Sequence, residues 1–132
     1  MIAWLNGVLD RREDTAQDAG GPNARWERRD LASVVDEAGR PVVFSDRGLT
    51  GPEQADHIAL NDPKQILDDV ASDRAVIAMY EAAQQDAATP SAWDDTAQHV
   101  AAAMERVVRL TAAKYTTWPG YQQSWAPEGS RG

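Results

Sequence analysis

The chain has 132 residues, of which 42% are hydrophobic and 26% are charged; its net charge is −8, and it contains no cysteine. This length suits one domain with a modest core, and the composition is that of a globular chain rather than a disordered one. Without cysteine, disulfides and thiolate metal sites are excluded.

The negative charge is concentrated in residues 52–95, where Lys64 and Arg74 stand against ten acidic residues. Proteins bind nucleic acids largely by displacing counterions with lysine and arginine, so nucleic acid is not the expected partner. No apolar run reaches the length of a membrane span, and charges close the apolar start of the chain too early for a signal peptide. We therefore expect a cytoplasmic protein without a membrane partner.

The first predicted element is a helix over residues 2–19, because apolar residues recur there at helical spacing. The sequence GGPN, residues 20–23, ends it. A two-stranded antiparallel hairpin is predicted over residues 32–44, where two valine-containing runs flank a turn that begins at Asp36. Asp36 can bond its own backbone in such a turn, and Gly39 supplies a left-handed residue. Pro41 has no amide hydrogen to donate, which places its strand at an edge.

A short helix over residues 53–60 and a long one over 63–85 are predicted on either side of the stretch HIALNDP, residues 57–63. Asp62 immediately precedes Pro63, and Gln65 follows three residues after Asp62. This is the arrangement of an N-cap, a proline at the first helical position and a capping-box partner. We therefore interpret Asp62 as a helix cap. His57 lies near the end of the shorter helix, where an imidazole can bond free carbonyl groups, and its expected role is structural.

Arg74 falls on the apolar side of the long helix, between Val70 and Ile77. A charge on such a side needs a partner, so Arg74 is expected to pair with an acid of a neighbouring helix; an anion-binding role is the alternative. The acids of this helix are expected on its solvent face: Asp68, Asp69 and Asp73.

The last predicted helix covers residues 92–115, with Ser91 and Asp94 as a capping box at its start. Its predicted apolar side consists of Trp93, Ala97, Val100, Met104, Val107 or Val108, and Thr111. Together these elements predict a mainly α fold of about four helices with a small hairpin. We expect a single domain over residues 1–126 and a frayed tail over 127–132.

The sequence HIALNDPKQIL, a later arginine and the ending WPGYQQSW resemble a family of small proteins, a domain of unknown function from actinobacteria and their phages. The matching residues are Leu5, Leu9, Asp10, Glu13, Trp26, Asp36, Gly39, His57, Ile58, Ala59, Asp62, Pro63, Leu67, Val70, Arg74, Tyr115, Pro119, Gly120, Tyr121 and Trp125. They extend over nearly the whole chain. A weaker likeness is to phage accessory proteins in which a similar element opens a long helix. The resemblance implies an accessory protein of an actinobacterium, a prophage or a phage, and brings no assigned activity.

The residues show no complete catalytic set, because no serine, threonine or cysteine stands in a known nucleophile pattern and no spacing selects three or four metal ligands. No catalytic residue, metal or cofactor is therefore predicted. If the protein is a weak enzyme or has a small-ligand or metal site, the candidate cluster is His57, Asp62 and Arg74.

Binding of another protein is the favoured function, with a homodimer as one form of it. Interfaces are enriched in tryptophan, tyrosine and arginine, and the candidate interface residues are Trp4, Trp118, Tyr121 and Trp125. A third hypothesis is an acidic DNA mimic that blocks a nucleic-acid-binding protein, motivated by the charge of residues 52–95.

Overall fold

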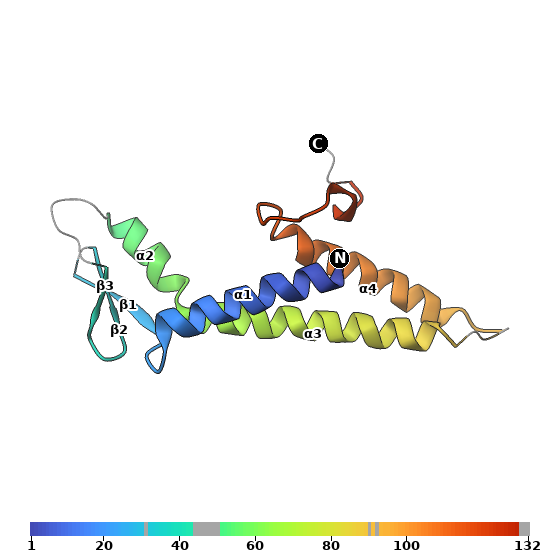
Figure 1. Cartoon of the computed structure of the whole chain (residues 1–132), viewed down its shortest axis with the longest axis horizontal. Helices are drawn as coiled ribbons and strands as arrows, with labels where there is room; N and C mark the ends of the chain where they lie inside the picture. The colour runs from blue at the N-terminus through green and yellow to red at the C-terminus, as the bar shows by residue number, and fades with distance from the viewer. Residues whose placement is uncertain (31, 44–50, 90, 92, 130–132) are drawn as a thin grey trace. The chain divides into compact units, whose positions relative to one another are not determined.

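The computed structural model describes residues 1–30, 32–43, 51–89, 91 and 93–129 (Figure 1). In chain order its elements are α1 (Ile2–Gly20), β1 (Trp26–Arg29), β2 (Ser33–Asp36), β3 (Pro41–Val43), α2 (Pro52–Leu60), α3 (Pro63–Ala87), α4 (Thr96–Ala113) and the 3-10 turn η1 (Gln123–Trp125). The prediction of a mainly α fold with four helices is confirmed. Among the described residues, no helix is both long and apolar enough to cross a membrane.

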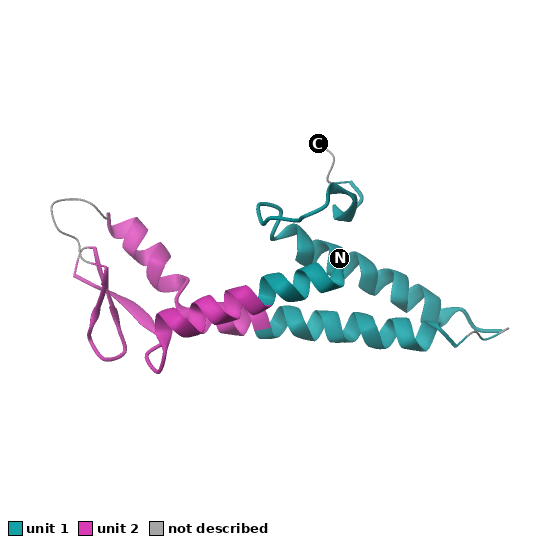
Figure 2. Ribbon diagram, viewed as in Figure 1, with its two compact units in different colours: residues 1–9, 71–132 teal, residues 10–70 magenta. Residues whose placement is uncertain are grey.

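The chain forms two compact units (Figure 2). Unit 1 consists of residues 1–9 and 71–132, and unit 2 consists of residues 10–70. The long helices α1 and α3 contribute residues to both units, whereas the sheet and α2 belong to unit 2 and α4 belongs to unit 1.

The predicted two-stranded hairpin is part of a three-stranded antiparallel sheet with the order β1-β2-β3. The missed strand, β1, has the sequence Trp-Glu-Arg-Arg, and three of its four residues are exposed. It therefore lacks the apolar alternation by which a strand is recognised, and its place depends on backbone pairing with β2, such as Glu27 opposite Val35. Charged side chains are typical of an edge strand, where they discourage pairing with other chains.

The turn between β2 and β3 is built as the sequence predicts. Oδ1 of Asp36 accepts hydrogen bonds from the amides of Ala38 and Arg40 at 3.0 and 2.9 Å, and Oδ2 accepts from Arg40 Nε at 3.0 Å. Gly39 has a φ of +76°, in the left-handed region. Burial raises the pKa of Asp36, but these bonds and the positive charge of Arg40 outweigh it, and the pKa lies below its ordinary 3.8. Pro41 begins the edge strand β3, as expected, whereas residue 44 of the predicted hairpin lies outside the described residues.

Unit 2 has a small apolar core between the sheet and α2. Ala32, Val34 and Ala55 are buried in it, with Val34 and Ala55 fully inaccessible to solvent. Half-buried apolar side chains surround these three: Trp26, Val43, Ile58 and Ala59. The contact of α2 with the sheet gives the short hairpin the apolar support that such a hairpin needs in water.

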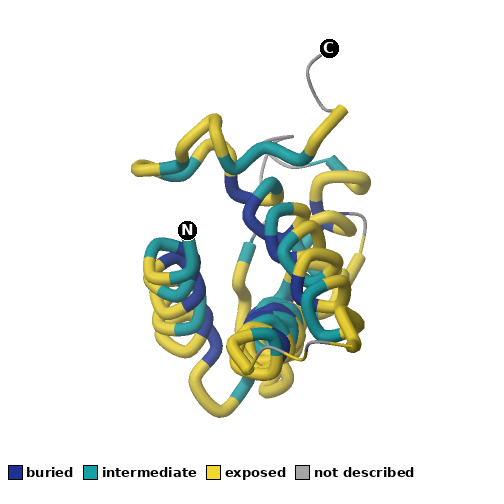
Figure 3. Tube along the Cα trace, turned by 90° about the vertical axis from the view of Figure 1, so that its right-hand side faces the viewer, coloured by how far each residue is buried: buried dark blue, intermediate teal, exposed yellow. Residues whose placement is uncertain are grey.

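In unit 1 the buried residues of α4 follow one side of the helix, with Ala101, Val108 and Ala112 almost completely inaccessible to solvent. Buried and exposed residues alternate around the turns of the helices in Figure 3. Leu5 and Leu9 of α1 are fully buried, and Ile77 of α3 is nearly so. The helices of unit 1 are therefore amphipathic in the way that helix packing requires.

The prediction that Asp73 lies on the solvent face of its helix is wrong, because its exposed fraction is only 5%. Its carboxylate accepts a hydrogen bond from the hydroxyl of Tyr115 at 2.7 Å and forms an ion pair with Lys114. These two partners stand at the C-terminal end of α4, so they compensate the buried charge and join α3 to α4 within unit 1.

The last helix begins at Thr96 rather than near residue 92, which itself lies outside the described residues. The predicted capping box does not form there. Oδ1 of Asp94 accepts from the amide of Thr96 at 2.9 Å and from its hydroxyl, while Ser91 Oγ accepts from the amide of Trp93 at 3.4 Å. The hydrogen bonds from Thr96 hold the pKa of Asp94 below its ordinary value. Both side chains thus form local turns ahead of the helix instead of a cap.

Candidate functional site

Asp62, the acid of the HIALNDP stretch, caps α3. Its Oδ1 accepts from the amide of Gln65 at 2.8 Å, as the N-cap interpretation requires, and its Oδ2 accepts from the amide of Trp26 at 3.0 Å. The side-chain nitrogen of Gln65 donates to Oδ1 of Asp69 at 2.9 Å, one turn further along the helix. Asp62 therefore joins the start of α3 to β1 within unit 2, and both carboxylate oxygens are engaged by backbone amides.

His57 lies in the last turn of α2, and its side chain is exposed. Its Nδ1 is 3.5 Å from the side-chain nitrogen of Asn61, and that amide also donates to the His57 carbonyl at 2.9 Å. Asn61, whose role the sequence pattern did not predict, thus bonds the carbonyl that the end of the helix leaves without an intrahelical partner. No described residue other than Asn61 is hydrogen-bonded to the imidazole of His57.

Arg74, the third residue of the predicted ligand cluster, belongs to unit 1, whereas His57 and Asp62 belong to unit 2. Arg74 is half-buried and makes an interaction of its own. Within the described ranges, no three histidine or acidic side chains form a group that could hold a metal ion.

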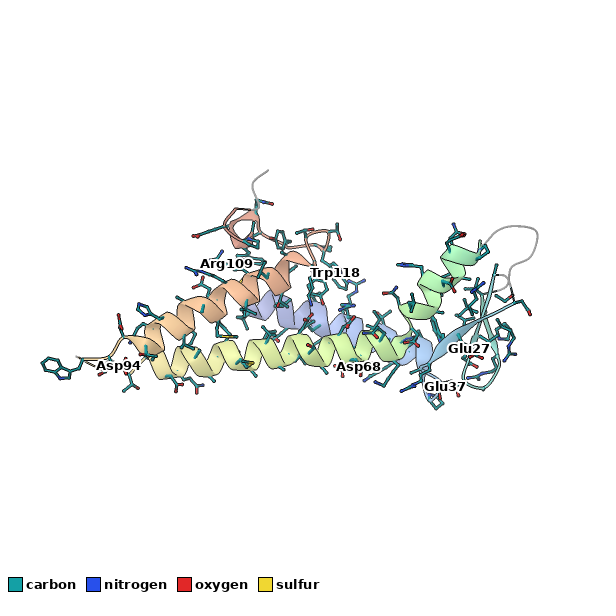
Figure 4. The ribbon with its side chains drawn as sticks, turned by 180° about the vertical axis from the view of Figure 1, so that it is seen from behind. Glu27, Glu37, Asp68, Asp94, Arg109 and Trp118 are labelled. Atoms are coloured by element: carbon teal, nitrogen blue, oxygen red, sulfur yellow. The ribbon has the colours of Figure 1, made fainter. Side chains whose placement is uncertain are left out.

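A polar hollow of about 750 Å³ lies on unit 2, beside β1, the turn after β2 and the start of α3. Its walls mix both signs of charge and include Glu27, Glu37 and Asp68, which are labelled in Figure 4. Several of its acids already have partners: Glu37 accepts from the amide of Arg25 at 2.9 Å, and Asp68 is paired with Lys64. The hollow is therefore a salt-bridged surface of this unit rather than a set of unpaired groups.

Three of the four predicted interface aromatics form a cluster within unit 1. The ring of Trp4 lies 5.7 Å from that of Tyr121 and 5.1 Å from that of Trp125, and the rings of Tyr121 and Trp125 are 5.8 Å apart. Trp4 also donates from Nε1 to the Pro119 carbonyl at 2.9 Å. The fourth, Trp118, meets Tyr115 edge to face at 6.2 Å. All four are half-buried, so the structure uses them for packing.

The tryptophan with the greatest exposure among the described residues is Trp93, which precedes α4 and is 96% exposed. Its predicted place on the apolar side of the last helix is wrong, because the helix begins three residues later, at Thr96. Asp94, its neighbour, is labelled beside the turn between α3 and α4 in Figure 4.

An exposed apolar row, here called the α4 stripe, runs along α4: Val100, Ala103, Val107 and Leu110. The exposed fractions are 49% for Val100, 38% for Val107 and 58% for Leu110, and Ala103 is exposed as well. The helical spacing of the sequence predicts Val100 on the buried side and does not decide between Val107 and Val108. The structure buries Val108 and exposes both Val100 and Val107. Residues at i, i+3, i+7 and i+10 lie on one side of an α-helix, so this spacing is the signal that could have identified the stripe.

A groove of about 1000 Å³ lies in unit 1 between α4 and the segment that follows η1. It is lined by Arg106, Arg109 and Leu110 from the helix and by Pro127 and Glu128 from that segment. Arg109 closes one side, since it donates to the Ser124 carbonyl at 2.8 Å and pairs with Glu105 (Figure 4). Arg106 is exposed, and no described residue forms an ion pair with it.

A family model, described as a family of unknown function (DUF6221), matches residues 1–127. Comparison with curated proteins finds no match. Comparison with solved structures likewise finds none. Since the match covers nearly the whole chain, the protein belongs to the DUF6221 family of unknown function.

Proposed function

We propose that this chain is a non-enzymatic accessory protein that works by binding another protein. The observation that carries the proposal is the apolar surface of unit 1, above all Trp93 with 96% of its surface exposed. Tryptophan is strongly enriched among the residues that dominate binding energy at interfaces. A tryptophan whose surface is left almost entirely uncovered by the described residues of its unit is a suitable anchor for a partner.

The α4 stripe gives the same unit a second apolar feature. Val100, Val107 and Leu110 are exposed although other apolar residues of the helix are buried. Contiguous exposed apolar residues on a protein surface mark interaction sites more often than isolated ones do. The setting that we propose, a phage, a prophage or an actinobacterial cell, follows from the resemblance of the HIALNDP stretch and the WPGYQQSW ending.

The test is an affinity capture from a nuclease-treated actinobacterial lysate, read by mass spectrometry, with the variant Trp93→Ala beside the wild type. Because Trp93 is almost fully exposed, its replacement leaves the packing of unit 1 intact. Leu60→Ala is the matched control, since Leu60 is an exposed apolar residue of unit 2 with 74% of its surface exposed.

We expect the wild type and Leu60→Ala to capture one protein from the lysate in stoichiometric amount, and Trp93→Ala to lose it. It is refuted if the wild type retains no protein in stoichiometric amount, or if Trp93→Ala retains the same protein as strongly as the wild type. Far-UV circular dichroism of the variants checks that their helix content is unchanged.

A further inference from the structure

The α4 stripe and the arginine beside it indicate what kind of partner this surface fits. Val100, Ala103, Val107 and Leu110 extend over about 15 Å of helix at 1.5 Å per residue. This spacing of three and four residues is the one at which the apolar residues of a second helix can pack between those of the first. A helical segment of about three turns matches this length.

The charge of α4 is the second feature that indicates the kind of partner. Although the whole chain has a net charge of −8, α4 carries Arg106 and Arg109 against the single acid Glu105. Arg109 and Glu105 pair with each other at 2.9 Å, which leaves Arg106 as the exposed cation next to the stripe. In α4, Arg106 precedes Val107 and lies four residues before Leu110, so it flanks the apolar row on the same part of the helix.

A second copy of this chain fits the surface less well than an acidic partner does. The four positions of the stripe are spaced evenly before and after position 105 in the sequence. An antiparallel contact with two-fold symmetry would therefore place Val100 opposite Leu110 of the other copy. That symmetry also places Arg106 near its own equivalent, and like charges at such a contact are unfavourable. The charge of α4 is instead complementary to a helix with carboxylates beside its apolar row.

We propose that the α4 stripe binds an amphipathic helix of another protein, and that a carboxylate of this helix pairs with Arg106. The inference rests on the proposed function, since it specifies the partner's chemistry and the face that receives it. Apolar contact along the stripe supplies the binding, and Arg106 selects acidic over basic helices.

The experiment uses the full chain and two fluorescent synthetic peptides of about three heptads, with leucine at both apolar positions. This length exceeds the three turns that the stripe can contact, because shorter peptides form little helix in water. The peptides differ only in their flanking positions, which are glutamate in one and lysine in the other. Fluorescence anisotropy measures both affinities for the wild type, Arg106→Glu and Val107→Asn. Arg11→Glu is the matched control, because it makes the same charge change at an exposed arginine of unit 2.

We expect the glutamate peptide to bind the wild type about tenfold more tightly than the lysine peptide does. Arg106→Glu should reverse this order, Arg11→Glu should retain it, and Val107→Asn should weaken both peptides. A preference for glutamate that persists in Arg106→Glu overturns the role of Arg106.

Two further results would overturn the inference about the acidic helix without refuting the proposed function. If neither peptide binds but the lysate capture still depends on Trp93, the chain binds a protein that is not an acidic helix. If sedimentation shows a dimer that Val107→Asn dissociates, the stripe is occupied by a second copy. Failure of the proposed function shows itself separately, as a capture without any partner.

Discussion

Replacing Tyr115 with phenylalanine tests how much of the stability of unit 1 depends on its buried carboxylate. The Tyr115 hydroxyl donates to Asp73 at 2.7 Å, and the exposed fraction is 5% for each of the two residues. A hydrogen bond to a charged group contributes about 1.5–3 kcal/mol, and a buried acceptor that loses its donor is not compensated by water. We therefore expect Tyr115→Phe to lower the free energy of unfolding by about 2 kcal/mol.

Tyr121 provides the matched substitution in the same unit. Its hydroxyl oxygen is buried as well, but among the described residues it has no hydrogen-bond partner. Burying a hydroxyl without a partner is unfavourable, so removing it relieves a cost instead of breaking a bond. Tyr121→Phe should leave the free energy of unfolding unchanged or raise it by up to about 1 kcal/mol.

Urea unfolding followed by tryptophan fluorescence is the suitable assay, because Trp4, Trp93, Trp118 and Trp125 belong to unit 1 and Trp26 alone to unit 2. With a denaturant slope of roughly 1–3 kcal/mol per molar urea, the two variants should differ in midpoint by about 0.7–3 M. Equal midpoints for Tyr115→Phe and Tyr121→Phe would show that the hydroxyl of Tyr115 gives Asp73 no net stabilisation, and would refute this reasoning.

Three further predictions concern single positions. Asp62→Ala removes a helix cap and the acceptor of a part-buried sheet amide. In urea unfolding it should lower the free energy of unfolding by about 2–4 kcal/mol. Asp68→Ala, which breaks an exposed ion pair, should lower it by less than about 1 kcal/mol. Gly120→Ala places a Cβ 3.0 Å from the Trp4 indole at a φ of +88°, whereas Gly129→Ala has a similar φ and no described neighbour within 4 Å. Both should cost about 1–2 kcal/mol of backbone strain, but only Gly120→Ala should also change the tryptophan fluorescence. The pKa of Asp36 is lowered in the fold, so the ionised carboxylate stabilises the folded state fully above about pH 3.8. This stabilisation is lost as the pH falls through the lowered pKa. In an acid titration, Asp36→Asn should therefore lose less stability than the wild type does.

Local signals in the sequence predicted those parts of the fold that depend on neighbouring residues. The turn at Asp36 and Gly39 and the cap at Asp62 followed from the bonding capacity of one side chain and the backbone freedom of one glycine. The bounds of the first three helices agree with the prediction to within two residues. Each of these features is decided within a few residues along the chain.

The features that were missed depend on contacts between distant residues. Asp73 has the same local pattern as an exposed acid, and only its partners 41 and 42 residues away explain its burial. Strand β1 consists mostly of charged residues and forms because its backbone pairs with that of β2. The side of α4 that faces solvent could not be chosen from the sequence, because Val107 and Val108 fit equally well and tertiary packing buries Val108.

The division of the chain into units has a consequence for its synthesis. Unit 2 is one continuous segment, residues 10–70, whereas unit 1 combines residues 1–9 with residues 71–132. The bond from Trp4 to the Pro119 carbonyl spans 115 residues, and Tyr121 and Trp125 are made later still. During translation, unit 2 has all its residues available first, whereas Trp4 has its partners only after residues 119–125 have been synthesised. Until then the first turns of α1 lack the residues of unit 1 that cover Trp4 in the folded structure.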